Sequence, residues 1–220
     1  MIDDLSATQR HDLQQAVLVL RQGGVVAFPT ETYYGLAVDP FNDQALERLF
    51  QLKKRPAQKP VLVLIDSQKR LPLLASEIPG QFRPLMERFW PGPLTLIFPA
   101  RPNLSSTLTA STGTVGVRIS SQPLAHSLTA MAGGVITATS ANLSGLSPAT
   151  TAQEIMTQFG HGLDWLLQGG PTQGGLASTI VAPCDKGLTL IREGAIPFAE
   201  VVKAGVSAPS RGPMADVKNC

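Results

Sequence analysis

The stretch VITATSAN, residues 135–142, decides how the fold is interpreted, because an apolar run and a polar turn meet inside it. The residues from Val135 to Thr139 are mostly apolar or β-branched, which is typical of a buried strand. Ser140 and Asn142 are favoured in turns, since their short polar side chains bond to nearby backbone. The same hydroxyl and amide groups are also able to orient a small polar substrate. The segment therefore predicts a strand that ends in either a structural turn or a substrate-positioning turn.

A second polar signature, KKRP at residues 53–56, follows a helical stretch. Cations in the last turn of a helix stabilise it by about 0.3–1 kcal/mol each through the helix dipole. Alternatively, Lys53 and Arg55 are fixed cations that hold phosphate oxygens, and Lys59 with its flanking prolines keeps the next loop stiff and basic. The paired glycines elsewhere match neither known glycine-rich phosphate motif. A fold that brings this signature next to residues 140–142 would make a nucleotide site without such a loop.

Helical and strand patterns alternate along most of the chain, which predicts a layered α/β fold with a mixed sheet. Helices are expected at 8–22, 42–55, 67–76, 81–89 and 122–132, and from a capping box at 151–154. Strands are expected at 25–28, 61–65, 94–98, 114–119, 135–139, 163–167, 178–182 and 188–192. Residues 204–220 lack periodicity and are expected to form a flexible tail after a domain spanning 1–203.

The bulk composition is that of a globular protein, with 43% hydrophobic residues in a chain of 220. No apolar run approaches the roughly 20 residues that cross a bilayer, and the acidic start does not resemble a secretory signal. We therefore expect a soluble, cytoplasmic protein with no membrane partner. A net charge of +2 gives little electrostatic support for nucleic-acid binding. No metal-ligand cluster is visible, so Mg²⁺ is expected only together with a nucleotide.

Two further places carry candidate binding groups. The loop at residues 29–35 follows a strand, where α/β folds place ligand sites, and combines hydroxyls, a carboxylate and two aromatic rings. For Thr30 the simpler interpretation is a turn in which the side chain bonds its own backbone. Arg118 and Arg192 each end an apolar strand. They either extend to solvent or grip a carboxylate or phosphate with a bidentate fork.

Seven segments in a fixed order resemble the YrdC/Sua5 family of threonylcarbamoyl-AMP synthases, over roughly residues 8–198. They are PTETYYGLA (29–37), the Lys-x-Arg of 53–55, FWPGPLT (89–95), TVGVRIS (114–120), TSANLSG (139–145), STIV (178–181) and IREG (191–194). Each segment is weak alone, but the ordered set is specific. The resemblance implies a twisted mixed sheet flanked by helices, with a concave substrate cleft.

The resemblance also implies a nucleotidyltransferase reaction. L-threonine, bicarbonate and ATP, with Mg²⁺, would give L-threonylcarbamoyladenylate and pyrophosphate, and a threonylcarbamoyl-transferase complex would use the product for the t6A modification at position 37 of tRNA. In this family the threonine nitrogen is carboxylated, and the new carboxylate attacks the α-phosphate. Cations and amides that position the reactants and stabilise charge suffice for this, without a covalent nucleophile.

Site roles follow from the resemblance, motif by motif. The catalytic set is Lys53, Arg55, Ser140 and Asn142. The ATP-binding set is Lys53, Arg55, Lys59, Thr114, Asn142, Thr150 and Arg192. The threonine-binding set is Thr32, Arg118, Ser140 and Ser178, with Arg118 as the partner of the carboxylate.

The chain departs from the family pattern at two positions. Leu64 stands where some members have a histidine that contacts threonine, and Tyr33 stands where many have valine. Two alternatives stay open at this point: a double-stranded RNA-binding or ribosome-maturation protein, and a paralogue without synthase activity. Lys53, Arg55, Ser140 and Asn142 are all intact, which argues against the paralogue.

Overall fold

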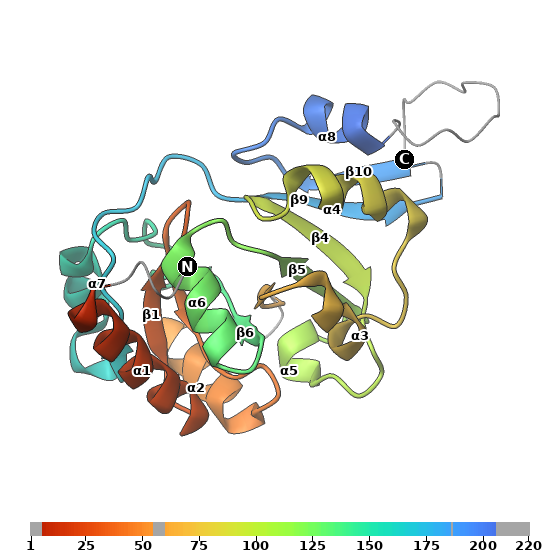
Figure 1. The fold of residues 1–220 in the computed structure, drawn as a ribbon. Helices are drawn as coiled ribbons and strands as arrows, with labels where there is room; N and C mark the ends of the chain where they lie inside the picture. The colour runs from red at the N-terminus through yellow and green to blue at the C-terminus, as the bar shows by residue number, and fades with distance from the viewer. Residues whose placement is uncertain (1–5, 55–59, 186, 206–220) are drawn as a thin grey trace.

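A computed structural model of the chain describes residues 6–54, 60–185 and 187–205 (Figure 1). Its strands form a four-stranded sheet in the order β7-β2-β1-β8 and a six-stranded sheet in the order β10-β9-β4-β5-β3-β6. The first contains β1 (Val26–Pro29), β2 (Tyr34–Ala37), β7 (Thr139–Ser140) and β8 (Trp165–Leu166). The second contains β3 (Val63–Ile65), β4 (Leu94–Pro99), β5 (Thr114–Arg118), β6 (Val135–Thr137), β9 (Thr179–Cys184) and β10 (Gly187–Arg192).

Both sheets mix parallel and antiparallel pairs. The helices are α1 (Ala7–Arg21), α2 (Asp43–Lys53), α3 (Leu71–Leu74), α4 (Arg83–Phe89), α5 (Ser106–Thr109), α6 (Pro123–Met131), α7 (Ala152–Phe159) and α8 (Phe198–Gly205). Single 3₁₀ turns lie at Gln68–Arg70, Gly80–Phe82 and Gly160–Gly162. The expected mixed α/β fold flanked by helices is confirmed, and its strands are divided between two sheets.

The expected strand 135–139 is divided between the two sheets. Thr137 at the end of β6 pairs with Val63 of the six-stranded sheet, whereas Thr139 in β7 pairs with Leu36 of the four-stranded sheet. Ala138 lies between them, and its amide donates to the Leu62 carbonyl at 2.7 Å. One short stretch of backbone therefore joins the sheets and sets where the following Ser-Ala-Asn turn lies.

Two apolar clusters hold these elements together. The smaller cluster packs α1 and α6 against β1 and includes Leu13, Leu20, Phe28, Leu124 and Leu128, all nearly fully buried. Burying one such side chain stabilises the fold by about 1.5–3 kcal/mol. The larger cluster joins both sheets to α2, α4 and α8. In Figure 1, α1 and α6 lie together beside the four-stranded sheet, and α4 and α8 lie together over β9 and β10.

Several boundaries differ from the sequence-based expectations. The strand β2 at residues 34–37 was not expected, and its first two residues belong to the expected loop 29–35. Four consecutive buried positions do not alternate as a half-exposed strand does. The strand β1 includes Pro29, which pairs with Tyr34, so it ends one residue later than expected. The helix α8 was not expected, and it runs two residues past the proposed domain boundary at 203, to Gly205. Residues 206–220 lie outside the described part, so the tail stays a prediction.

In the described residues, no helix has both the length and the apolar character needed to span a bilayer.

The predicted capping box at the start of α7 is present. The Thr151 side chain accepts a hydrogen bond from the Glu154 amide, and the Glu154 carboxylate accepts one from the Thr151 amide. Further bonds from Thr150 to this carboxylate are the main cause that lowers the pKa of Glu154. The box therefore fixes both the start of α7 and the preceding Thr150.

Substituting Thr151→Ala should lower the free energy of unfolding by about 1 kcal/mol, because an amide at the start of α7 loses its acceptor. Urea denaturation followed by circular dichroism measures the change. Thr157→Ala is the matched control in the same helix, since it removes only a bond to the Gln153 carbonyl, and should stay within about 0.5 kcal/mol of wild type. Equal losses in the two variants would contradict the capping role.

Candidate functional site

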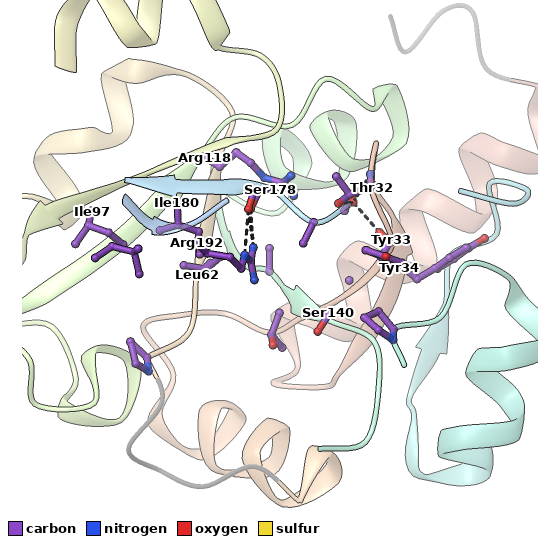
Figure 2. Close-up of a pocket in the computed structure, with 18 residues that line it drawn as sticks. Thr32, Tyr33, Tyr34, Leu62, Ile97, Arg118, Ser140, Ser178, Ile180 and Arg192 are labelled. Atoms are coloured by element: carbon purple, nitrogen blue, oxygen red, sulfur yellow. Dashed lines mark hydrogen bonds between the residues drawn. The ribbon is translucent and has the colours of Figure 1, made fainter. Parts of the chain in front are cut away.

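A pocket of about 290 Å³ lies between the two sheets (Figure 2). Its walls come from β2, β7 and the turn before β2 on one side, and from β4, β5, β9 and β10 on the other. Five of the residues chosen from the sequence line it: Thr32, Arg118, Ser140, Ser178 and Arg192. The group contains all four residues assigned to threonine and one assigned to ATP. Segments that are far apart in the sequence therefore meet at one place.

The floor of the pocket is apolar and depends on Gly116 in the middle of β5. A Cβ atom at this position would lie 2.4 Å from the Leu62 Cδ2 atom and 3.0 Å from the Ile97 Cδ1 atom. The absence of a side chain thus leaves room for Leu62 and Ile97, which line the pocket with Ile180. Arg118, two residues after Gly116, lies on the same face of the strand. An aliphatic surface therefore borders the charged group.

The turn between β1 and β2 presents Thr32 to the pocket. The Thr30 hydroxyl donates to the Tyr33 carbonyl at 2.6 Å, and the Thr32 amide donates to the Thr30 hydroxyl at 3.2 Å. The expectation that Thr30 bonds its own turn is therefore confirmed. Thr32 is held by this turn and lines the pocket.

Arg118 is buried, with a side chain that is 8% exposed. Its Nη1 donates to Glu31 Oε1 at 2.9 Å. Burial lowers the pKa of Arg118, and the negative charge of Glu31 opposes this effect. The alternative in which Arg118 extends to solvent is wrong, because the side chain ends in an ion pair beside the pocket.

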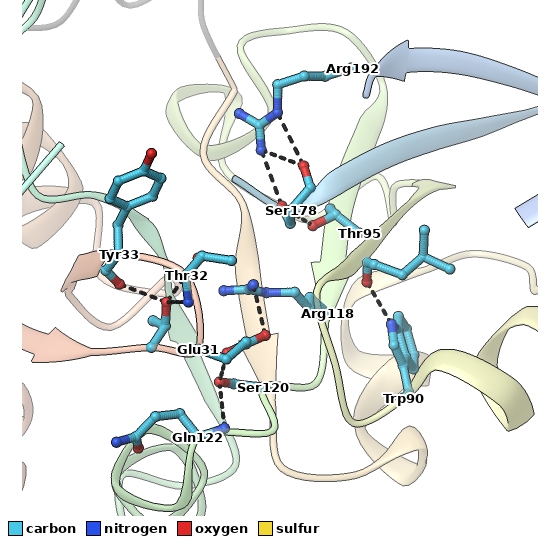
Figure 3. Close-up of polar contacts among 12 residues, drawn as sticks. Glu31, Thr32, Tyr33, Trp90, Thr95, Arg118, Ser120, Gln122, Ser178 and Arg192 are labelled. Carbon is cyan, nitrogen blue, oxygen red and sulfur yellow. Dashed lines mark hydrogen bonds and ion pairs between the residues drawn. The ribbon is translucent and has the colours of Figure 1, made fainter. Parts of the chain in front are cut away.

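Arg192 ends β10 and lies against Ser178 (Figure 3). Its Nη2 donates to the Ser178 carbonyl at 2.8 Å and to the Ser178 hydroxyl at 3.1 Å. The Ser178 hydroxyl also bonds to Thr95 Oγ1 at 3.0 Å. Arg192 is exposed overall, but its guanidinium is partly buried. This burial, and secondly the nearby charge of Arg118, lower the pKa of Arg192. The two cations therefore interact electrostatically within one site.

Lys53 links the two polar signatures of the sequence. It is the last residue of α2 and is only 2% exposed. Its Nζ donates to the carbonyls of Ser140 and Asn142, the latter at 2.9 Å. The Ser144 amide returns a bond to the Lys53 carbonyl at 2.9 Å. A solvated cation that acts only on the helix dipole does not describe this lysine, because it binds the Ser-Ala-Asn turn.

The turn itself is internally bonded. The Ser140 hydroxyl donates to Asn142 Oδ1 at 2.6 Å, and the Asn142 amide nitrogen donates to the Leu146 carbonyl at 2.8 Å. Ser140 lines the pocket, whereas Asn142 is not among its lining residues. Both alternatives for this turn therefore describe part of it: its polar groups stabilise a structural turn and also border the site.

The remaining predicted residues lie elsewhere. Thr114 is at the opposite end of β5 from Arg118, roughly 13 Å along the strand, and its hydroxyl bonds to Thr112 Oγ1 at 2.8 Å. Thr150 donates to the Glu154 carboxylate through its amide at 2.6 Å and its hydroxyl at 3.1 Å. Neither lines this pocket. Arg55 and Lys59 lie outside the described residues. The assignments of all four to ATP stay predictions.

Leu64, the position of one departure from the family pattern, is buried in the cluster with α1 and α6 and does not line the pocket. Tyr33, the other departure, forms a hydrogen bond through its side chain. Its hydroxyl donates to the Gly175 carbonyl at 2.7 Å, and the Gly174 amide donates to the Thr32 carbonyl at 2.7 Å. The turn before β2 therefore holds the glycine-rich segment that leads to Ser178.

Glu31 belongs to the expected binding loop 29–35, but its pairing with Arg118 was not expected, and no role was expected for Ser120 or Thr95. Each of the three bonds to a pocket residue or to its partner. Glu31 lies within the segment PTETYYGLA, so its position was visible, but its partner is 87 residues away. No spacing rule connects residues so far apart. Among the described residues, no cluster of three or more His, Cys, Asp or Glu is suited to a metal ion.

A family model for Sua5, YciO and YrdC, described as "Telomere recombination", matches residues 18–194. Proteins called threonylcarbamoyl-AMP synthase are similar along most of the chain. The one from Pyrococcus abyssi is 37% identical over 84% of this chain and 54% of its own length. The one from Bacillus subtilis is 40% identical over 88% and 56%, and the one from Idiomarina loihiensis is 40% identical over 66% and 78%. The chain thus spans about half the length of the first two.

Solved structures agree with this similarity. The structure of P. abyssi Sua5 complexed with L-threonine has a TM-score of 0.84 and 36% identity, and the match covers 87% of this chain and 56% of that one. Escherichia coli YciO has a TM-score of 0.77, with 88% of this chain and 93% of that chain covered. Its identity is 24%, so it supports the fold alone.

Substituting Lys53→Met should lower the free energy of unfolding by about 1–3 kcal/mol, because two carbonyls lose a buried charged donor while the apolar stem is kept. Amide hydrogen exchange at residues 141–146 should become faster. Lys54→Met is the matched control, because Lys54 is the adjacent, exposed lysine. Similar exchange in the two variants would show that Lys53 does not hold the turn.

Substituting Tyr33→Phe should loosen residues 170–177, because one bond to the Gly175 carbonyl is lost at an exposed position. The free energy of unfolding should change by less than about 1 kcal/mol, while hydrogen exchange in this segment becomes faster. Tyr34→Phe is the comparison variant, because it removes a hydroxyl on a buried ring. In the wild-type protein this Tyr34 hydroxyl donates to the Gly170 carbonyl at 2.8 Å. Unchanged exchange in Tyr33→Phe would mean that its hydroxyl does not restrain the segment.

Proposed function

Because the chain belongs to the Sua5/YciO/YrdC family, we propose that it is an L-threonylcarbamoyladenylate synthase. It would be a nucleotidyltransferase that converts L-threonine, bicarbonate and ATP into threonylcarbamoyl-AMP and pyrophosphate. One observation carries the proposal: Thr32, Arg118, Ser140 and Ser178 line a single pocket together with a second arginine, Arg192. Similar proteins are called threonylcarbamoyl-AMP synthases, and one of them, P. abyssi Sua5, has been solved with L-threonine.

In this proposal Arg118 binds the carboxylate of threonine. Its guanidinium borders the pocket and uses one nitrogen for Glu31, which leaves further N–H groups for a fork-like contact. The hydroxyls of Thr32, Ser140 and Ser178 supply the hydrogen bonds that a β-hydroxy amino acid needs. The aliphatic floor of Leu62, Ile97 and Ile180 excludes water from this end of the pocket.

The chemical steps then need positioning and charge stabilisation. The threonine nitrogen attacks the carbon of bicarbonate, water leaves, and the resulting carbamate oxygen attacks the α-phosphorus of ATP. The bond from this phosphorus to the bridging oxygen breaks, and pyrophosphate departs. Arg192, Arg55 and Lys59 are proposed to hold phosphoryl oxygens, and Lys53 to keep the Ser140–Asn142 turn in place. Preorganised donors of this kind lower the barrier without a covalent intermediate.

Mg²⁺ is proposed to accompany ATP. The described residues provide no ready-made set of carboxylate and histidine ligands, and Glu31, beside the pocket, is already paired with Arg118. The phosphates would therefore supply the oxygens that this ion prefers. The proposed location is the cytoplasm, and the product would reach tRNA through a threonylcarbamoyl-transferase complex.

The two alternative functions stay predictions. Duplex RNA binding would use the same cations against phosphates. The nearly balanced charge of 18 Lys and Arg against 16 Asp and Glu gives it no particular support. A paralogue without synthase activity would keep the fold, but the four residues proposed to bind threonine all line the pocket, which favours the synthase.

Pyrophosphate release by the purified protein with Mg-ATP should require both L-threonine and bicarbonate, and an enzyme-coupled phosphate assay measures it. Arg118→Ala should raise the KM for threonine by at least about 30-fold, since losing one partner of a buried charge pair costs at least about 2 kcal/mol. The KM for ATP should remain close to wild type.

Arg83→Ala is the control, because Arg83 is exposed at the start of α4, outside the pocket. Arg118→Lys keeps the charge but not the planar fork, so its KM for threonine should lie between those of the wild type and Arg118→Ala. Pyrophosphate release that is independent of threonine would refute the proposed function. A defect of Arg118→Ala in ATP binding alone would refute the assigned role of Arg118.

A further inference from the structure

The two arginines of the pocket have different electrostatic partners. Arg118 forms an ion pair with Glu31, with an Nη1–Oε1 distance of 2.9 Å and side chains that are 8% and 14% exposed. Arg192 donates to the carbonyl and hydroxyl of Ser178, which are neutral acceptors. No carboxylate pairs with Arg192 within the described part of the chain. The charge of Arg118 is therefore compensated by a carboxylate, whereas that of Arg192 is not compensated by one in the described residues.

Glu31 is held firmly in its pairing position. Its second oxygen, Oε2, accepts a hydrogen bond from the Ser120 hydroxyl, and that hydroxyl accepts one from the Gln122 amide at 3.2 Å. Gln122 in turn caps α6 by accepting from the Ala125 amide at 3.0 Å. The carboxylate thus cannot rotate away from Arg118 without breaking a chain of bonds that starts at a helix (Figure 3).

Glu31 acts on the pocket from behind Arg118. Arg118 lines the pocket and Glu31 does not. Of the five N–H groups of this guanidinium, Nη1 supplies the bond to Glu31, and no other bond of the guanidinium to a described residue is seen. Arg118 therefore offers hydrogen-bond donors to a ligand while Glu31 cancels most of its charge.

This arrangement divides the pocket into two halves of different charge. A zwitterion such as a free amino acid has a carboxylate that needs donors but no net charge, so it suits the half at Arg118. A polyphosphate carries several negative charges and would be repelled there by Glu31, because charges interact strongly where burial limits water. It suits the half at Arg192, where the positive charge is not compensated.

We propose that Glu31 is a specificity-determining residue that keeps polyphosphate out of the amino-acid half of the pocket, so that the zwitterionic amino acid and the polyphosphate bind side by side without competing. The inference rests on the proposed function for the identity of the amino acid. The competing interpretation is that Glu31 serves only as a structural counterion for a buried arginine.

Isothermal titration calorimetry with inorganic tripolyphosphate and with L-threonine separates the two interpretations. The wild-type protein should bind both ligands together, so saturating threonine should leave the tripolyphosphate affinity unchanged. In Glu31→Gln the tripolyphosphate affinity should rise by about tenfold or more, and saturating threonine should now reduce it. Glu31→Asp keeps the charge and should behave as wild type does.

Unchanged tripolyphosphate affinity in a folded Glu31→Gln protein, with no competition by threonine, would overturn the proposal. Arg192→Ala provides an arm that does not depend on the stability of Glu31→Gln. It should weaken tripolyphosphate binding by about tenfold or more, and tripolyphosphate should still not compete with threonine, since Arg118 remains paired with Glu31. Tripolyphosphate that displaces threonine from Arg192→Ala would equally overturn the proposal.

The tripolyphosphate measurements also distinguish this inference from the proposed function. A wild-type protein that binds no threonine would refute the synthase proposal. The change in tripolyphosphate affinity between Glu31→Gln and Glu31→Asp would still decide the role of Glu31.

Discussion

The passage of the backbone from one sheet to the other at Ala138 is the constraint on which the site depends. Thr137 is still paired in the six-stranded sheet and Thr139 is already paired in the four-stranded sheet. Ala138, Thr139 and Ser140, three consecutive residues at this passage, all line the pocket. The Ala138 amide bond to the Leu62 carbonyl fixes the register at the crossing. The pocket exists because two sheets are joined here at a defined position.

Lys53 and Glu31 are buried or half-buried charged residues that fix polar groups rather than face solvent. Lys53 ends α2 and bonds the backbone of the Ser140–Asn142 turn, while Glu31 orients Arg118 and lowers the net charge around it. Buried charges are costly unless their donors and acceptors are matched. These residues meet that condition through carbonyls, a guanidinium and the Ser120 hydroxyl. The contacts of Lys53 and Glu31 thus both position polar groups of the site and set the charge around them.

Local signals in the sequence predicted local structure well. Asn42 caps α2, and the Thr151 capping box starts α7, because both depend on bonds between residues three positions apart. Residue patterns alone indicated Ser140, Arg118 and Arg192, whereas the family resemblance supplied the roles. Contacts such as that of Glu31 with Arg118, 87 residues apart, follow no periodicity. The strand β2 was missed because it is buried on both faces and follows a turn of hydroxyl residues. Tertiary pairing, which no local pattern encodes, decided these features.

The wide separation of the pocket residues has a consequence for folding. Glu31 and Ser120 are 89 residues apart, and Lys53 and Ser140 are 87 apart, so long loops must close before the pocket forms. Such non-local contacts are made slowly, and they are lost together when either sheet opens. A ligand that fills the pocket therefore binds only the complete fold and stabilises both sheets by mass action. The concentration of such a ligand and the stability of the folded chain are therefore thermodynamically linked.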